Sequence, residues 1–290
     1  MISKSWTYSY CWQWLAVFDM NRQEICPKLN IVVCMKQVPD TKKVQLNTGT
    51  NTLDRNNINK MMNPADASAL EQAYRLKKAN GGEASVRALT MGPRSAEDVL
   101  KQAAHQGADR LILLTDSAYV GSDTYATAKI LSRAILTTGP FDLILCGRKT
   151  IDGETGQVGP QLSVQLGVPC LTNVTGIELN LPGILCKRLT EKGIDEIYVP
   201  LPAVVTLCEN MPEHKPALAE LRKAREINIE QISNRHLELE GQESGLKGSK
   251  TRVVRILHHT YQSRNCRMTD SMEEAADLVM NKISENRKNE

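Results

Sequence analysis

A segment rich in glycine and acidic residues follows the apolar run 141–146, and its residue types suit the binding of a nucleotide. The apolar run is typical of a strand covered on both faces. Glycines let backbone N–H groups approach an anionic or ribose-bearing ligand closely, and here they are Gly147, Gly153, Gly156 and Gly159. A helix expected over 156–166 offers its free N–H groups to a phosphate. The pattern favours a nucleotide-type cofactor, with Asp152 and Glu154 available for sugar hydroxyls, over an ordinary glycine-rich connection.

Other chemistries lack their usual residue patterns in this chain. The eight cysteines contain no CxxC pair and the five histidines form no ligand set, so we expect no metal site. Neither a P-loop motif (GxxxxGKS or GxxxxGKT) nor a GxSxG nucleophile motif is present. The net charge of +3 is too small to indicate a nucleic-acid partner. Without an apolar run of about eighteen residues, we expect no membrane insertion.

The elements around the glycine-rich segment alternate between strand and helix. Strands are expected at 30–36, 83–90, 110–114 and 141–146. Helices are expected at 64–78, from the loop MGPRSAED to about residue 105, at 123–137 and at 156–166. Such alternation with short connections predicts an α/β fold with a doubly wound, mostly parallel sheet. Ligands bind such sheets at the carboxyl ends of the strands.

The later part of the chain has a different pattern. After a last alternating strand expected at 168–174, short strands at 177–181, 185–189 and 194–201 predict a small antiparallel edge, and 203–208 a final buried strand. Residues 30–208 are therefore expected to form the nucleotide-binding domain. Residues 209–290 are polar, with helices expected at 217–225 and 272–282, and we expect an extended arm that contacts another subunit. Residues 1–29 hold all three tryptophans and are expected to be a disordered, non-native or upstream extension.

Four stretches of the chain, in order, resemble the β subunit of electron-transfer flavoproteins. They are NIVVCMKQVPDT at 30–41, NPADASALEQAYRLK at 63–77, GRKTIDGETGQVG at 147–159 and LPAVVT at 201–206. The resemblance extends from residue 30 to about residue 255. It implies a Rossmann-like fold, similar to that of adenine-nucleotide α-hydrolases, and a cytoplasmic electron carrier rather than an enzyme that acts alone. It also implies an α subunit as partner, which holds a second FAD.

The resemblance assigns nucleotide contacts residue by residue. The residues it implies are Cys34, Asn63, Pro64, Ala65, Asp66, Met91, Asp123, Thr124, Gly147, Arg148, Lys149, Thr150, Ile151, Asp152, Gly153, Glu154, Thr155, Gly156, Gln157 and Val158. From capping chemistry alone, Asn63 is a helix N-cap and needs no ligand. Cys34 and Met91, taken alone, are core residues. Leu218 matches the leucine with which the family docks onto a dehydrogenase, although Ala219 stands where the family has proline.

The residues at 123–124 and the string IDGETGQVGP resemble family members that bifurcate electrons, which favours FAD over AMP in this site. The implied function passes electrons from NADH to an acyl-CoA dehydrogenase and to ferredoxin or flavodoxin. One alternative is a conventional carrier whose β subunit binds structural AMP. Another is an adenine-nucleotide hydrolase or transferase, which the absence of glycine from KQVPDTKK at 36–43 disfavours.

Overall fold

The computed structural model describes residues 29–40, 46–47, 52–53, 59–209, 211–239, 243–252, 269 and 271–288. The chain divides into two compact units, Met1–Arg252 and Val253–Glu290. The second unit contains one described helix, α9 (Met272–Lys288), which confirms the helix expected at 272–282. The expectation for residues 1–29 lies outside the described residues except at Leu29. That side chain is 2% exposed and belongs to the core.

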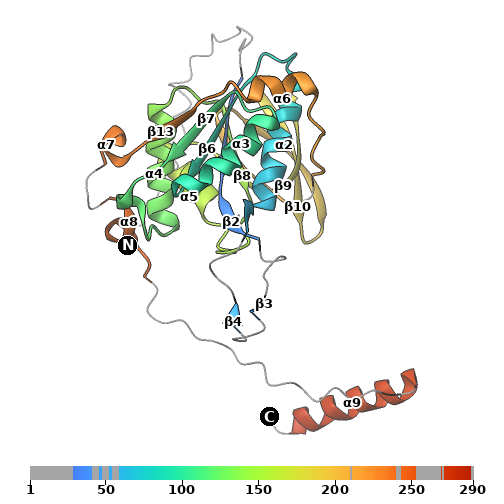
Figure 1. Ribbon diagram of the computed structural model, residues 1–290. Coiled ribbons are helices and arrows are strands. Elements are labelled where there is room, and N and C mark those ends of the chain that lie inside the picture. Colours follow the sequence, from blue (N-terminus) through green and yellow to red (C-terminus); the bar gives the residue numbers. More distant parts are fainter. Residues whose placement is uncertain are drawn as a thin grey trace, which may run out of the picture. The chain divides into compact units, whose positions relative to one another are not determined.

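A nine-stranded sheet forms the centre of the first unit, in the order β11-β10-β9-β12-β8-β1-β6-β7-β13 (Figure 1). The strands are β1 (Asn30–Met35), β6 (Ser85–Met91), β7 (Arg110–Leu114), β8 (Leu143–Gly147), β9 (Cys170–Asn180), β10 (Gly183–Thr190), β11 (Gly193–Pro200), β12 (Ala203–Leu207) and β13 (Ile229–Ile232). In this spatial order, every pair of neighbouring strands from β9 through β12, β8, β1, β6 and β7 to β13 is parallel. Strand β10 pairs antiparallel with β9 and with β11. The predicted fold class, a mostly parallel α/β sheet with an antiparallel edge, is confirmed.

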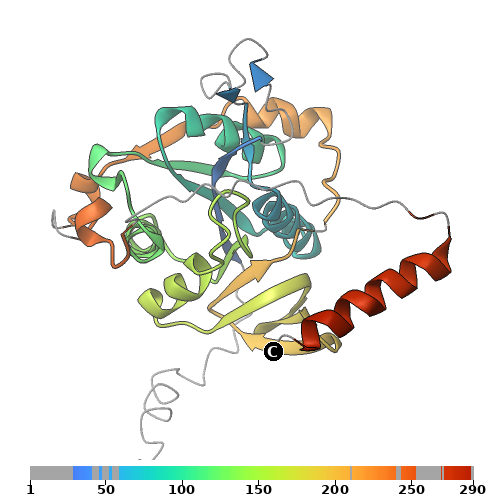
Figure 2. The same ribbon diagram turned by 90° about the horizontal axis from the view of Figure 1, so that it is seen from below.

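Helices cover both faces of this sheet. They are α2 (Pro64–Ala79), α3 (Glu97–His105), α4 (Thr124–Thr137) and α5 (Val158–Leu166), with short 3-10 turns η3 (Arg94–Ala96) and η4 (Ser117–Tyr119). The apolar sides of α2 and α3 share one core with the strands, and those of α4 and α5 share the other. Figure 2 shows α4 and α5 side by side, across the sheet from α2. This arrangement is a doubly wound sheet.

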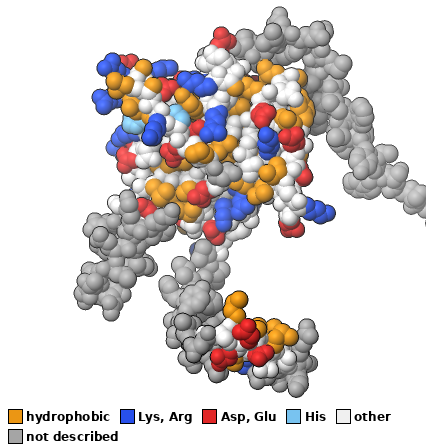
Figure 3. Space-filling model, turned by 90° about the vertical axis from the view of Figure 1, so that its right-hand side faces the viewer, with side chains coloured by type: hydrophobic (Ala, Val, Ile, Leu, Met, Phe, Trp, Pro, Cys, Tyr) orange, Lys and Arg blue, Asp and Glu red, His pale blue; other side chains and the backbone are white. Residues whose placement is uncertain are grey.

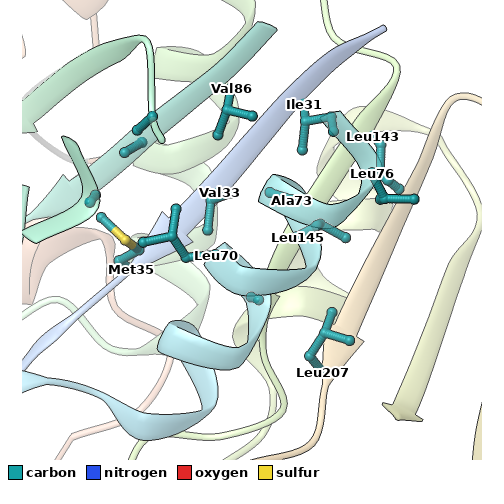
Figure 4. Close-up of a cluster of buried hydrophobic side chains, with 14 of the residues drawn as sticks. Ile31, Val33, Met35, Leu70, Ala73, Leu76, Val86, Leu143, Leu145 and Leu207 are labelled. Carbon is teal, nitrogen blue, oxygen red and sulfur yellow. The ribbon is translucent and has the colours of Figure 1, made fainter. Parts of the chain in front are cut away.

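The α2 side of the sheet has a core of interlocking aliphatic side chains. Leu76 of α2 lies beside Ile31 of β1 and Leu143 of β8, and Leu70 of α2 lies beside Val33 of β1 (Figure 4). Each of these five side chains is at most 2% exposed. Burying one such aliphatic side chain stabilises the fold by roughly 1.5–3 kcal/mol, so this cluster fixes α2 across the ends of β1 and β8.

The carboxyl ends of β1 and β8 mark the topological switch point of the sheet. These strands are neighbours in parallel register, with Cys34 opposite Cys146. The chain leaves β1 towards α2 on one face and leaves β8 towards α5 on the other. In open α/β sheets, ligands bind in the crevice outside the strand ends at the point where two such connections diverge, so we take this place as the candidate ligand crevice.

Two features of the sheet differ from the sequence predictions, and one agrees with them. The two strands expected at 168–174 and 177–181 are one strand, β9, whose pairing with β10 shifts register between Lys187 and Arg188. The expected strand 194–201 is β11 and pairs with β10 along its whole length. Strand β13 was not predicted at all, and it extends the parallel sheet beyond β7. Residues 209–252 therefore contribute a strand to the first compact unit.

The remaining described elements lie around the sheet. Strands β2 (Gln37–Pro39) and β5 (Lys60–Met62) form an antiparallel pair, as do β3 (Leu46–Asn47) and β4 (Thr52–Leu53). The short helices α6 (Leu218–Ala224), α7 (Asn234–Leu237) and α8 (Gly245–Gly248) follow β12. Among the described helices, none combines the length and the apolar character needed to cross a bilayer. Acidic and basic side chains are interspersed on the face in Figure 3.

Candidate nucleotide-binding site

The carboxylate of Asp66 joins the two strand ends that border the crevice. Its Oδ2 accepts a hydrogen bond from the N–H of Lys36 at 2.8 Å, directly after β1, and its Oδ1 accepts one from Gly147 at 2.9 Å, at the end of β8. Asp66 lies in the first turn of α2 and is 4% exposed. Burial raises the pKa of Asp66 to about 7, against the opposing effect of the hydrogen bonds from Lys36, Gly147 and Asn63.

Gly147 lies so close to the start of α2 that no other residue fits there. A Cβ at this position would contact the Asp66 carboxylate and would lie 2.8 Å from the Cβ of Ala65. Separations below 3.0 Å force a shift in the structure. The glycine after β8 therefore allows the backbone of the following segment to pass directly over the N-terminus of α2.

Asn63 occupies the N-cap position of α2 but does not cap the helix with its side chain. Its Nδ2 donates to the carbonyl of Lys149 at 3.0 Å, and its Oδ1 accepts from the N–H of Ile151 at 3.1 Å. The side chain is fully buried. The interpretation of Asn63 as an ordinary helix cap is therefore wrong, because its amide group holds the backbone of the glycine-rich segment.

We call residues 147–158 the nucleotide loop. Two further backbone hydrogen bonds hold it, one at its start and one within it. The N–H of Arg148 donates to the carbonyl of Leu207 in β12 at 2.7 Å, and the N–H of Glu154 donates to Thr150 at 2.9 Å. Glu154 and Gly156 have positive φ values of 50° and 63°. Within the described chain, the N–H groups of the three residues Gly153, Thr155 and Gly156 have no partner. These amides are free for a ligand.

Two ion pairs join the acidic residues of the nucleotide loop to lysines. Lys36 lies 2.6 Å from Asp152, and Lys149 lies 2.9 Å from Glu154. Partial burial works to raise the pKa of Asp152, but the bonds from Lys36 and Thr150 outweigh it and leave this pKa below its usual value. The Lys149 ammonium lowers the pKa of the exposed Glu154. Both side chains are carboxylates at neutral pH, the form that accepts hydrogen bonds from sugar hydroxyls.

The start of α4 reaches the same site through one side-chain contact. The hydroxyl of Thr124 donates to Oε1 of Gln157 at 2.9 Å. Asp123 caps α4, because its Oδ1 accepts from the N–H of Ala126 at 2.9 Å, and its Oδ2 accepts from the N–H and hydroxyl of Thr251 at 2.7 and 2.9 Å. Burial works to raise the pKa of Asp123, but these bonds outweigh it and lower the pKa. Asp123 is therefore the N-cap of the helix expected at 123–137.

The structure also places the other residues singled out in the sequence. Pro64 and Ala65 open α2 beside Asp66, so the groups 63–66, 123–124 and 147–158 come together. Cys34 is buried, and burial raises the pKa of its thiol to about 12. Met91 ends β6, partly buried against the core. Leu218 lies elsewhere, at the first position of α6, and is 65% exposed.

Two contributors to the site were not identified from the sequence. Lys36 supplies the N–H bound by Asp66 and the ammonium bound by Asp152. Leu207 accepts a hydrogen bond at the start of the nucleotide loop through its backbone alone, for which a sequence carries no signal. The position of Lys36 directly after the first strand was the available signal, because that is where ligand-binding groups of such sheets lie. No grouping of His, Cys, Asp and Glu suited to a metal ion occurs within the described ranges.

An open α/β sheet with a glycine-rich loop at its switch point has the architecture of the sheets that bind nucleotides there. Residues 50–236 match the family model for the electron transfer flavoprotein domain. The chain is 36% identical over 258 residues to the electron transfer flavoprotein subunit beta of Thermoanaerobacterium thermosaccharolyticum, covering 88% of this chain and 98% of that one. The chain therefore belongs to the electron transfer flavoprotein family, as a β-subunit-type electron carrier.

Two further relatives carry other names. The FixA protein of Azorhizobium caulinodans is 38% identical over 265 residues, which cover 88% of this chain and 94% of the relative. The caffeyl-CoA reductase-Etf complex subunit CarD of Acetobacterium woodii is 36% identical over 228 residues, which cover 78% and 87%. The hypothesis of a nucleotide hydrolase or transferase gains no support from these similarities.

Proposed function

We propose that the crevice between β1 and β8 binds FAD, and that the chain works as a heterodimer with an α subunit that holds a second FAD. The hydrogen bond between Thr124 and Gln157 is the observation that carries the choice of FAD over AMP. It joins the start of α4 to the nucleotide loop. A ligand at the loop is thus bordered by a second helix N-terminus, as suits a dinucleotide with two phosphates.

The residues of the chain divide the binding work between backbone and side chains. The free amides of the nucleotide loop and the first turn of α5 bind the diphosphate, and Asp152 and Glu154 bind sugar hydroxyls. Asn63 and Asp66 hold the loop from beneath and orient its amides. The flavin, when bound, supplies the redox chemistry, while the protein fixes its position and surroundings.

We propose further that electrons enter from NADH and leave by two routes, to an acyl-CoA dehydrogenase and to ferredoxin or flavodoxin. The similarity to a subunit of a caffeyl-CoA reductase-Etf complex supports a CoA-linked partner. Leu218, exposed and surrounded by charged residues, is the proposed anchor for the dehydrogenase. One apolar contact with a charged rim suits a transient encounter. Such a carrier works in the cytoplasm.

The test is an anaerobic assay of the heterodimer co-expressed with its α subunit. NADH is supplied together with a purified acyl-CoA dehydrogenase, its enoyl-CoA substrate and ferredoxin. We expect ferredoxin reduction by NADH only when the dehydrogenase and its substrate are also present. Ferredoxin-independent transfer to the dehydrogenase would instead indicate a conventional carrier, the alternative that binds AMP.

A further inference from the structure

One side of α2 carries polar residues that all contact residues 211–220, which comprise part of the segment between β12 and α6 and the first turn of α6. They are Ser68, Glu71, Tyr74, Arg75 and Lys78, and their spacing of three and four places them on one face of the helix. The segment runs alongside α2 in Figures 1 and 2. We call this set of five residues the α2 polar face.

The first contacts fix the backbone of the segment. The N–H of Met211 donates to the hydroxyl of Ser68 at 3.3 Å, and Arg75 donates from Nη2 to the carbonyl of Pro212 at 3.3 Å. Arg75 also lies 2.7 Å from Glu71 through its Nε. Two successive residues of the segment are therefore attached to α2 through their backbone atoms.

His214 makes the most extensive contacts with this face. Its N–H and its ring Nδ1 lie 3.0 and 2.7 Å from Oε2 of Glu71, a side chain that is almost fully buried. Its ring stacks on that of Tyr74, with centroids 3.5 Å apart and planes 4° from parallel. Burial works to raise the pKa of Glu71, but the bonds from His214 and Arg75 outweigh it and lower the pKa. A hydrogen-bonded buried carboxylate is a rigid attachment point.

The last contacts fix the start of α6. Glu220 accepts from the N–H of Ala217 at 2.8 Å through Oε2. Its Oε1 accepts from the hydroxyl of Tyr74 at 3.1 Å and lies 3.2 Å from the ammonium of Lys78. Tyr74 therefore contacts both His214 and Glu220, on either side of the exposed Leu218.

We propose that the α2 polar face is a positioning device for partner docking, which holds residues 211–220 in one conformation so that Leu218 is presented to the dehydrogenase. This inference rests on the proposed docking role of Leu218. If a leucine lies on a mobile segment, ordering of that segment on docking costs free energy and weakens binding. A segment that is already attached to the protein before docking avoids this cost. Glu71, Tyr74 and His214 act through Leu218 and do not touch the partner.

The experiment measures electron exchange between the complete heterodimer and a purified acyl-CoA dehydrogenase, with the dehydrogenase concentration varied to give KM and kcat. The variants are Leu218→Ala, His214→Ala, Glu71→Gln, Tyr74→Phe and the double variant His214→Ala/Leu218→Ala. Glu83→Gln is the matched control, because Glu83 is an exposed carboxylate beyond the end of α2. Hydrogen exchange of residues 209–224 reports the order of the segment in each variant, and the NADH reduction rate reports an intact flavin site.

We expect Leu218→Ala and His214→Ala each to raise KM about tenfold, a typical loss at an interface anchor, with kcat and NADH reduction unchanged. The double variant should be no worse than Leu218→Ala alone, and His214→Asn, which retains a donor for Glu71, should recover part of the loss. Tyr74→Phe keeps the stacking and should have a smaller effect.

A raised KM for Leu218→Ala with a normal KM for His214→Ala, Glu71→Gln and Tyr74→Phe would overturn the positioning role and leave the docking role intact. A normal KM for Leu218→Ala would instead refute the docking role, and the inference with it. If Glu71→Gln does not fold, Tyr74→Phe and His214→Ala still decide between these results.

Discussion

Asp66 and Gly147 are joined by a 2.9 Å hydrogen bond that attaches the end of β8 to the first turn of α2. The two residues are 81 positions apart in the chain. Because the other carboxylate oxygen binds the N–H of Lys36, one side chain holds the backbone just after β1 and at the end of β8. The position of α2 over these two strand ends therefore depends on Asp66, and the path of the nucleotide loop depends on the absence of a side chain at residue 147.

Replacement of Gly147 by alanine should damage both the fold and the site. The new Cβ meets Asp66 and Ala65, and overpacking of this kind costs about 1–3 kcal/mol. We expect a lower free energy of unfolding in urea and loss of bound nucleotide from the purified heterodimer. Gly176→Ala is the control, since nothing lies within 4 Å of its Cβ and the residue lies in β9, outside the nucleotide loop. Equal nucleotide content in both variants would contradict this account of the loop.

Asp66 should make stability depend on pH in the direction opposite to most carboxylates. Its folded-state pKa of about 7 lies above the ordinary aspartate pKa of 3.8, so between these values the folded state holds a proton that the unfolded state has released. The contribution of Asp66 to the free energy of unfolding therefore falls by up to about 4 kcal/mol as the pH rises through this window. Above the window the contribution is constant.

Urea unfolding at a series of pH values, for the wild type and Asp66→Asn, isolates this effect. Other carboxylates contribute equally to both proteins, so the difference between the two curves reports Asp66. We expect the variant to gain stability relative to the wild type from pH 4 to pH 7. A difference that does not change with pH would show that Asp66 is not protonated in the folded protein at neutral pH.

Asn63→Ala should release the nucleotide loop from α2. Both amide contacts disappear, and a part-buried carbonyl and a part-buried N–H lose their partners, at a cost below the roughly 1–3 kcal/mol of a fully buried group. Asn63→Asp tests the geometry more sharply, because an aspartate still accepts from Ile151 but places an oxygen against the carbonyl of Lys149. Both variants should lose FAD on gel filtration, and wild-type retention by Asn63→Asp would argue against the assigned amide orientation.

Asp123→Ala should weaken both the start of α4 and the attachment of residues 249–251. Loss of the helix cap costs about 1 kcal/mol, and Thr251 loses the acceptor for its N–H and its hydroxyl. Hydrogen exchange should accelerate in 243–252 and in the first turn of α4. Thr251→Val, which removes only the hydroxyl bond, should accelerate exchange in 243–252 alone. Unchanged exchange in Asp123→Ala would show that the two contacts contribute nothing.

The alternating part of the fold could be predicted from the sequence because each inner strand is apolar throughout. The pattern of buried residues in β1 and β8 is continuous, as expected for strands covered on both faces. Strand β13 lacks this signal, since Glu230 and Gln231 are exposed at the sheet edge. Strand β9 continues through Gly176, where the sequence suggested a break, because its pairing with β10 supplies the hydrogen bonds on both sides of the glycine.

The position of the site could be predicted, but not how it is assembled. Glycines after a buried strand indicated the nucleotide loop without knowledge of the fold. The roles of Asn63 and Asp66 depend on groups 81 to 88 residues away in the chain. Local capping rules consider only neighbours along the helix, and they predicted that the Asn63 side chain caps α2. In the structure this side chain instead hydrogen-bonds to the backbone of Lys149 and Ile151. The assignment of 209–290 as an arm that contacts the α subunit stays a prediction.

The identity and amount of the bound nucleotide test the central claim most directly. The heterodimer is purified after co-expression with its α subunit, its cofactors are released by denaturation, and FAD and AMP are quantified against protein. We predict two FAD and no AMP per heterodimer. One FAD with one AMP would contradict the assignment of FAD to the crevice between β1 and β8, and one FAD with no AMP would contradict nucleotide binding there altogether.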